Sequence, residues 1–350
     1  MTHLDRNENQ LGPAPECYEI LRRATRQELS EYSRDYLRGV KSVLSEAIAL
    51  EVGLRESEVL LSYGSEDMLK QIVHCYLGAG ESMMIPRYSW WYYKSVASEV
   101  GGESVEYPLH VNGSSYSFDA REIIAQVQSK KPRLMLCASP NNPTGNSLGL
   151  NDLHLILEEC KGTLIVIDEA YAGFTDGSAS ETVPLLVRKH NNLAVLRTFS
   201  KLYALAGIRI GYGFAGSAFG KLAAYSKRYL GYNQLSEKLA LAALRDKAYY
   251  ESVRRRVSDE RERLYLFFQA INGATVYRSD ANFLLVRLPV NTAATLKEHL
   301  TAAGIALKFF DEQEFAGHVR ITIGTPDQNS ALLGQLRKYF SDLHLISQQH

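Results

Sequence analysis

The 350-residue sequence predicts an α/β fold with a doubly wound, mostly parallel sheet in a large domain and a smaller α+β domain after it. Helix-like and strand-like segments alternate from about residue 58 to residue 215, as in parallel sheets whose crossover connections are helices. A long helical stretch at 233–270 then leads into a second run of short strands and helices. We therefore expect a connecting helix between two domains.

The elements follow from hydrophobic periodicity. Continuous apolar runs at 59–63, 132–138 and 163–167 are typical of strands buried on both faces of a parallel sheet. Helical periodicity occupies 65–77, 89–100, 119–129 and 151–160. Beyond residue 270 we expect a strand pair around 275–288, a helix near 293–303, an extended segment at 305–310, a strand at 318–323 and a last helix from 327.

The composition is that of an ordinary cytoplasmic enzyme. Lys plus Arg and Asp plus Glu number 39 each, so no net charge favours nucleic acid or a membrane surface. No apolar run approaches the roughly 20 residues that span a bilayer, and no signal-peptide core is evident. The widely spaced cysteines 17, 75, 137 and 160 show no metal-binding pattern, and we expect buried thiols.

An acidic motif follows the third apolar run. The run ends in Asp168-Glu169-Ala170-Tyr171. Ligands of open α/β sheets collect outside the carboxyl ends of the strands, so Asp168 can face a site there. It could pair with a protonated pyridine nitrogen, and Tyr171 could hydrogen-bond a phenolic ring oxygen. The alternative for Asp168 is a cap on the next segment.

A lysine and an arginine suggest the ligand itself. Lys201 ends Thr198-Phe199-Ser200-Lys201, and Arg209 follows eight residues later. The lysine could form a Schiff base with a phosphorylated aldehyde, while the hydroxyls and the guanidinium bind its phosphate. Upstream, the loop Ser139-Pro140-Asn141-Asn142-Pro143-Thr144-Gly145 could hold the amide of Asn142 rigidly toward a ligand. Together these motifs point to pyridoxal 5'-phosphate.

In this order the motifs resemble the fold-type I aminotransferases of classes I and II. The closest resemblance is to the histidinol-phosphate aminotransferase branch, through Asn7-Glu8-Asn9 with Gly12-Pro13 and through Val319-Arg320-Ile321-Thr322-Ile323-Gly324-Thr325. It implies a seven-stranded-type large domain at 31–245 and a small domain at 246–350, with residues 1–30 packing against the small domain. It also implies a homodimer that takes an amino donor and a keto-acid acceptor.

The resemblance assigns the site residue by residue. It implies that Lys201 is the catalytic lysine, that Asp168 pairs with the pyridine nitrogen, and that Asn142 and Tyr171 contact the phenolic oxygen. Phosphate contacts would come from Thr198, Ser200, Arg209 and the helix start Gly64-Ser65-Glu66, whose free amides favour an anion. Tyr88 would stack on the ring, and we expect most of the aromatic residues at 90–93 to belong to helix packing or to the rim of the site.

Substrate and partner contacts are also implied by the resemblance. Arg320 would bind an α-carboxylate, and Asn9 and Lys308 would lie near the substrate. Lys308 stands where the branch usually has an arginine. A tyrosine of the partner subunit would reach the cofactor phosphate; spacing favours Tyr36 over Tyr32, in a region that lacks the family's proline.

Three functional hypotheses remain open. The first is an aminotransferase, with histidinol phosphate as the favoured donor and aromatic or other amino acids as alternatives. The second is a lyase or decarboxylase of the same fold, similar to threonine-phosphate decarboxylases. The third is a non-catalytic sensor, disfavoured because Lys201 is present. Gly211-Tyr212-Gly213-Phe214-Ala215-Gly216 matches a dinucleotide-binding spacing, but the glycines fall within and just after a strand.

Overall fold

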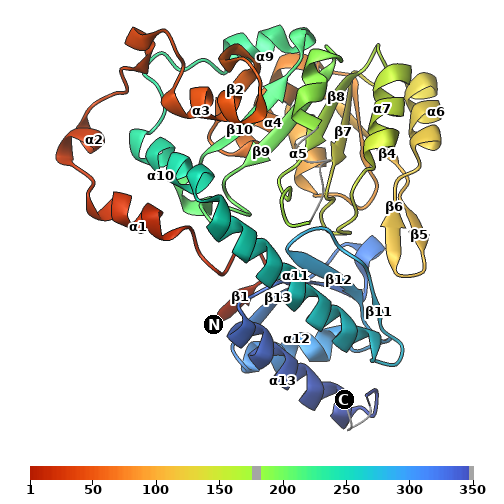
Figure 1. Cartoon of the computed structure of the whole chain (residues 1–350). Coiled ribbons are helices and arrows are strands. Elements are labelled where there is room, and N and C mark those ends of the chain that lie inside the picture. The colour runs from red at the N-terminus through yellow and green to blue at the C-terminus, as the bar shows by residue number, and fades with distance from the viewer. Residues whose placement is uncertain (176–182, 347–350) are drawn as a thin grey trace.

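The chain is built around two sheets joined by a long helix (Figure 1). The computed structural model describes residues 1–175 and 183–346, apart from the side chain of Tyr36. The larger sheet has seven strands in the order β2-β10-β9-β8-β7-β3-β4. These strands are β2 (Val59–Ser62), β3 (Ser82–Pro86), β4 (Glu103–Tyr107), β7 (Leu134–Ala138), β8 (Leu164–Asp168), β9 (Leu193–Thr198) and β10 (Gly211–Ala215).

The predicted mostly parallel sheet is confirmed. Only β10 runs against its neighbours, pairing antiparallel with both β2 and β9, whereas β9, β8, β7, β3 and β4 pair in parallel. Consequently the carboxyl ends of β7, β8 and β9 meet at one edge of the sheet. The loops that carry the predicted site motifs leave from that edge.

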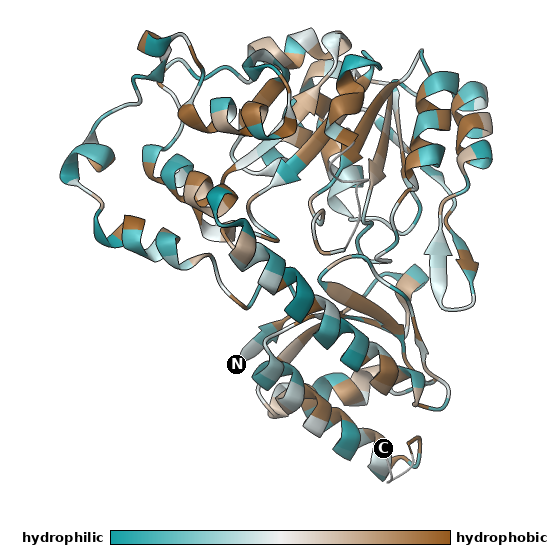
Figure 2. Cartoon of the chain, viewed as in Figure 1, coloured by the Kyte–Doolittle hydropathy of each residue, from teal (hydrophilic) through white to brown (hydrophobic). Residues whose placement is uncertain are grey.

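Helices cover both faces of this sheet because its strands alternate their apolar side chains. In β7, Leu134 and Leu136 pack with one set of helices, and Met135 and Cys137 with the other. Figure 2 shows hydrophobic residues concentrated on these strands. One face is covered by α4 (Ser65–Tyr76), α5 (Tyr92–Glu99) and α9 (Gly220–Tyr225), and the other includes α6 (Ala120–Lys130) and α7 (Leu150–Glu159).

The glycines of β10 allow this strand to pack closely against α4 and the turn before it. A Cβ on Gly213 would lie 2.5 Å from Met68 Sδ, and one on Gly211 would lie 2.7 Å from the backbone carbon of Gly64. Both contacts involve the start of α4 or the turn before it. The repeat therefore lets a helix approach an antiparallel strand, and it does not form the strand-turn-helix unit of a dinucleotide site.

The smaller sheet has five strands in the order β1-β13-β14-β12-β11. Its edge strand β1 comes from the amino terminus and pairs in parallel with β13. The other pairings are antiparallel. The strands are β1 (Thr2–Leu4), β11 (Thr275–Val276), β12 (Phe283–Arg287), β13 (Ile305–Phe309) and β14 (His318–Thr322), with α12 (Ala293–Ala302) and α13 (Pro326–Asp342) packed beside them.

The remaining helices connect these parts. The helical stretch expected at 233–270 is two helices, α10 (Gln234–Arg245) and α11 (Lys247–Gln269), separated at Asp246. With 23 residues, α11 is about 35 Å long and runs from the large sheet to the small one (Figure 1). The amino-terminal region adds α1 (Pro15–Arg22), α2 (Arg26–Ser30), η1 (Asp35–Arg38) and α3 (Val43–Val52). The hairpin of β5 (His110–Asn112) and β6 (Ser115–Ser117) forms a separate two-stranded sheet.

Among the described helices, none is long and apolar enough to cross a membrane. The expected domain boundaries at residues 30 and 245 stay a prediction.

Candidate active site

A cavity of about 570 Å³ lies where the edge of the large sheet faces the small sheet. Its walls come from the ends of β7, β8 and β9, the start of α4, the amino-terminal segment and strands β13 and β14. Most of the site residues expected from sequence line it. They are Ser65, Glu66, Tyr88, Asn142, Asp168, Tyr171, Thr198, Ser200, Lys201, Arg209, Lys308 and Arg320.

Asp168 is a buried carboxylate at the end of β8. Its Oδ2 accepts a hydrogen bond from the Tyr93 hydroxyl at 2.8 Å, and its Oδ1 accepts one from the Ala170 amide at 3.0 Å. Burial raises its pKa, against the opposing effects of Tyr93, the Ala170 amide and the charge of Lys201. No lysine or arginine of the described chain forms an ion pair with it. A cationic ring nitrogen in the cavity would supply the missing partner.

Tyr93 is a site residue that sequence reasoning missed. It belongs to α5, its side chain is only 2% exposed, and it lines the cavity beside Asp168. The sequence predicts only that most of the aromatic run at 90–93 belongs to helix packing or to the rim. The hydrogen bond to Asp168 distinguishes Tyr93 from its neighbours, and that contact joins residues 75 positions apart in the sequence.

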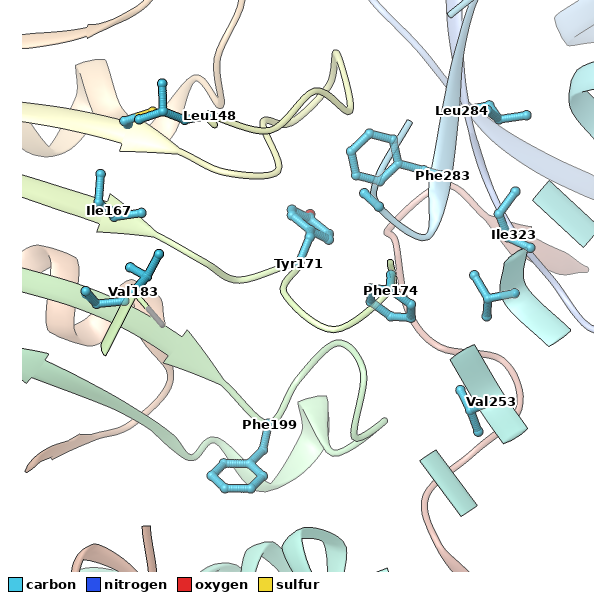
Figure 3. Packing of buried hydrophobic residues seen from close by; sticks show 14 of the residues in the cluster. Leu148, Ile167, Tyr171, Phe174, Val183, Phe199, Val253, Phe283, Leu284 and Ile323 are labelled. Carbon is cyan, nitrogen blue, oxygen red and sulfur yellow. The ribbon is translucent and has the colours of Figure 1, made fainter. Parts of the chain in front are cut away.

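Lys201 follows β9 and lines the cavity together with Tyr171. Its Nζ donates a hydrogen bond to the backbone oxygen of Arg6 at 3.1 Å and lies 5.5 Å from the centre of the Tyr171 ring. Tyr171 in turn packs edge-on against Phe283 of the small sheet, with ring centres 5.1 Å apart (Figure 3). The amino-terminal segment also contributes to the wall of the cavity, through residues 5–8.

Asn142 and Tyr171 each keep a hydrogen-bond donor free. Asn142 Oδ1 accepts a hydrogen bond from Arg320 Nη1 at 2.6 Å, so its amide nitrogen lies on the other side of the side chain. Tyr171 accepts a hydrogen bond from Asn7 Nδ2 at 2.9 Å, so its own hydroxyl hydrogen is not used in that contact. In the described part of the chain no acceptor is bound to either donor. Two such donors suit a phenolic oxygen.

A candidate phosphate cradle lies at the start of α4. Among the described residues, no side chain caps the first amides of this helix. Arg209 Nη1 donates to Ser200 Oγ at 3.4 Å, and the Thr198 hydroxyl donates to the same oxygen at 2.9 Å. Gly64 has a φ of 97°, and a Cβ there would lie 2.7 Å from Arg209 Nη2. The glycine thus lets the guanidinium approach a helix terminus that attracts anions.

Arg320 and Lys308 lie side by side on the small sheet, because they are register partners in β14 and β13. Arg320 is 9% exposed, and besides Asn142 it binds the backbone oxygen of Asp5 at 2.6 Å. Its Nε is buried without a partner in the described structure. Lys308 Nζ lies 5.4 Å from the centre of the Phe310 ring. This pair can bind an anionic group of a substrate.

Three expected residues fit less simply. Tyr88 lines the cavity, but its ring contacts Tyr116 and Phe315 edge-on, so stacking on a cofactor ring stays a prediction. Asn9 is not among the residues that line the cavity: its Nδ2 binds the Leu202 backbone oxygen and its Oδ1 accepts the Leu11 amide. Its contact with a substrate stays a prediction. Tyr36 lies in η1, and its side chain is outside the described part of the structure.

These features fit pyridoxal 5'-phosphate. Asp168 would lie at its pyridine nitrogen, Asn142 and Tyr171 at its phenolic oxygen, and Lys201 at its aldehyde carbon. The cradle formed by α4, Thr198, Ser200 and Arg209 would hold its phosphate. Each contact offers the hydrogen-bonding capacity or charge that the corresponding group of the cofactor needs.

Comparison with known proteins gives the same result. The family model "Aminotransferase class I and II" matches residues 1–336. A histidinol-phosphate aminotransferase of Archaeoglobus fulgidus is 32% identical over 339 residues, covering 97% of this chain and 93% of that protein. Two solved structures share the fold. A histidinol-phosphate aminotransferase from Sinorhizobium meliloti in complex with pyridoxal 5'-phosphate has a TM-score of 0.85 at 24% identity, covering 98% of this chain and 91% of that one. An L-threonine-O-3-phosphate decarboxylase from Porphyromonas gingivalis has a TM-score of 0.81 at 21% identity, covering 97% of this chain and all of that one.

Because the family model spans nearly the whole chain and the cavity carries the donors and charges that the cofactor needs, the chain belongs to the class I and II aminotransferase family and is a pyridoxal-phosphate-dependent aminotransferase.

Proposed function

We propose that this enzyme transfers an amino group between histidinol phosphate and 2-oxoglutarate. The single observation that carries the proposal is the pairing of Lys308 with Arg320 on one face of the small sheet, inside the same cavity as Lys201. A single arginine suffices for the α-carboxylate of glutamate. A second cation beside it suits the larger, more highly charged phosphate of an amino-alcohol phosphate.

The residues around the cofactor have distinct roles. Bound pyridoxal phosphate supplies an electron sink for the pair left when the donor loses its α-proton. Asp168 would keep the pyridine nitrogen protonated, and Asn142 and Tyr171 would donate hydrogen bonds to the phenolic oxygen. The phosphate group would be anchored by the start of α4, Thr198, Ser200 and Arg209.

Lys201 moves the proton. With the cofactor bound, the free amine of Lys201 would be the base that accepts the donor's α-proton and carries it between donor and cofactor. The backbone oxygen of Arg6, 3.1 Å from Nζ, accepts one of its N–H groups. That contact orients the amine, which leaves its lone pair for the transfer.

The far wall of the cavity supports a donor with a flat, polar ring. Tyr88, Phe310 and Phe315 supply aromatic surface, while Glu312 and Glu314 supply carboxylates at its edge. Aromatic side chains pack on a flat ring, and carboxylates accept hydrogen bonds from an imidazole N–H. This combination favours histidinol phosphate over phenylalanine, whose ring has no N–H to offer.

We also propose a homodimer. Leu29, Tyr32 and Tyr229 border one surface hollow and are 74%, 69% and 81% exposed. Large apolar side chains gathered this way are typical of a protein interface. Through that interface Tyr36 would contact the cofactor phosphate of the partner subunit.

Two measurements test the proposed reaction. Purified protein loaded with pyridoxal phosphate is mixed separately with histidinol phosphate, phenylalanine, tyrosine, arginine and threonine phosphate, and the visible absorbance is followed. We expect the fastest absorbance loss with histidinol phosphate. A fast response to phenylalanine beside an unchanged spectrum with histidinol phosphate would contradict the donor assignment. Carbon dioxide release from threonine phosphate without glutamate formation would instead support a decarboxylase.

A further inference from the structure

Asn7 is held rigidly between the two sheets. It is 1% exposed and has a φ of 56°, a left-handed conformation that asparagine tolerates better than most residues. Its backbone amide donates to Thr322 Oγ1 at 2.9 Å, and its backbone oxygen accepts from Asn282 Nδ2 at 3.1 Å. Both partners belong to the small-sheet region. Its side chain, however, reaches Tyr171 of the large sheet.

The orientation of the Asn7 amide follows from its neighbours. The Thr322 hydroxyl oxygen accepts the Asn7 backbone N–H, and in the structure the hydroxyl donates to Asn7 Oδ1, 3.2 Å away. With its side-chain oxygen on Thr322, Asn7 presents its side-chain nitrogen to Tyr171. The distance from this nitrogen to the Tyr171 hydroxyl oxygen is 2.9 Å.

This orientation determines what Tyr171 can do. An amide nitrogen only donates hydrogen bonds, so the Tyr171 oxygen is the acceptor in this contact. A phenol has a single hydrogen, which consequently cannot point at Asn7. In the described part of the chain that hydrogen has no other acceptor, and Tyr171 is one of the residues that line the cavity.

We propose that Asn7 is a positioning residue that directs the hydroxyl hydrogen of Tyr171 at the phenolic oxygen of the cofactor. The inference rests on the role proposed above for Tyr171. Because Asn7 is held by Thr322 and Asn282, the small sheet and the amino-terminal segment control a hydrogen bond made from the large sheet. Directing this hydrogen favours the deprotonated ring oxygen, since a donor stabilises a negatively charged acceptor.

The test is a pH titration of the visible absorbance of the cofactor-loaded protein. Tyr171→Phe removes the donor, and we expect the midpoint of the absorbance change to rise by about one to two pH units. A shift of this size corresponds to the free energy of one hydrogen bond to a charged group. Asn7→Asp keeps the side-chain shape and tolerates the same backbone conformation, but it replaces the amide donor with an acceptor. The Tyr171 hydrogen should turn toward it, and the midpoint should again rise.

A double-mutant cycle isolates the coupling. Asp at position 7 also adds a charge, and that contribution persists when Tyr171 is already Phe. We expect Asn7→Asp to raise the midpoint by about one pH unit more in the native background than in the Tyr171→Phe background. Thr322→Val, which adds no charge and frees the amide to rotate, should give a smaller coupled rise. Asn112→Asp on the exposed hairpin is the matched control and should leave the midpoint unchanged.

The outcomes separate the inference from the function on which it rests. Equal shifts in both backgrounds, for Asn7→Asp and for Thr322→Val, would overturn the inference while leaving the role of Tyr171 intact. A Tyr171→Phe protein with an unchanged midpoint would overturn both. Thermal unfolding of the cofactor-free variants adds a second readout, because a purely structural role for Asn7 would lower the melting temperature without moving the midpoint.

Discussion

Replacing Asp168 with asparagine removes the charge at the ring nitrogen and little else. The carboxylate is 6% exposed, and both of its hydrogen bonds can be retained, because an amide oxygen still accepts the Ala170 N–H and Tyr93 can reorient its hydroxyl. A carboxylate and a pyridinium about 3 Å apart attract each other by about 5 kcal/mol at an effective dielectric constant of about 20.

Loss of that attraction should appear mainly in the chemical step. Without the anion the ring nitrogen loses its proton and the electron sink weakens, so a change of about 5 kcal/mol corresponds to roughly four orders of magnitude in rate. The assay is a single-turnover reaction, in which loaded protein is mixed rapidly with excess glutamate and the cofactor absorbance is followed. Cofactor affinity should fall less, because the phosphate contacts are unchanged.

Asp259→Asn, at an exposed position on α11, is the matched control and should react like the native protein. A near-normal single-turnover rate for Asp168→Asn would refute the reasoning. The carboxylate would then be a structural group that holds Tyr93 and the Ala170 amide.

Further predictions concern the lysine, the cations and a buried acid. Borohydride should attach the cofactor irreversibly to Lys201, and Lys201→Ala should lose this attachment and turnover while still folding; an adduct mapped to another lysine by mass spectrometry would contradict the assignment. Arg320→Ala should weaken binding of 2-oxoglutarate by about 2–5 kcal/mol, whereas Lys308→Ala should impair only donors with a phosphate or a second acid; equal kinetic losses for both donor classes would argue against this division. Burial raises the pKa of Glu237 to about 7, although a hydrogen bond from Ser42 opposes the shift. The pKa of Glu237 is higher in the folded protein than in the unfolded chain. The stabilising contribution of Glu237 is therefore present at pH values below the unfolded-state pKa and is lost as the pH rises toward 7. Glu237→Gln should therefore increase the free energy of unfolding at pH 8, by at most about 3 kcal/mol, and change it little at pH 4.5; an equal effect at both pH values would show that this side chain does not titrate as described.

Much of the site could be predicted because it depends on local sequence. Asn142, Asp168 and Lys201 each follow an apolar run, and such runs are adjacent parallel strands here, so their carboxyl ends meet. The phosphate cradle was predictable for a similar reason, since a glycine before a helix leaves its first amides free.

The contacts that sequence reasoning missed depend on tertiary structure. Tyr93 lies in an aromatic run in which packing and functional residues have the same pattern, and only its hydrogen bond to Asp168 separates them. Asn7 reaches Tyr171 across 164 positions and depends on a left-handed backbone that no hydrophobic pattern records. Asn9, which the resemblance places near the substrate, binds main-chain atoms of Leu202 and Leu11, and its substrate contact stays a prediction.

The most direct test of the proposed reaction is product analysis with the proposed pair of substrates. Loaded protein would be incubated with histidinol phosphate and 2-oxoglutarate, and glutamate and the keto product would be quantified, with the Lys201→Ala protein as the blank. We predict that glutamate and the keto phosphate form in equal amounts and that both require Lys201. Absence of glutamate under conditions in which the same preparation transfers an amino group from another donor would contradict the account.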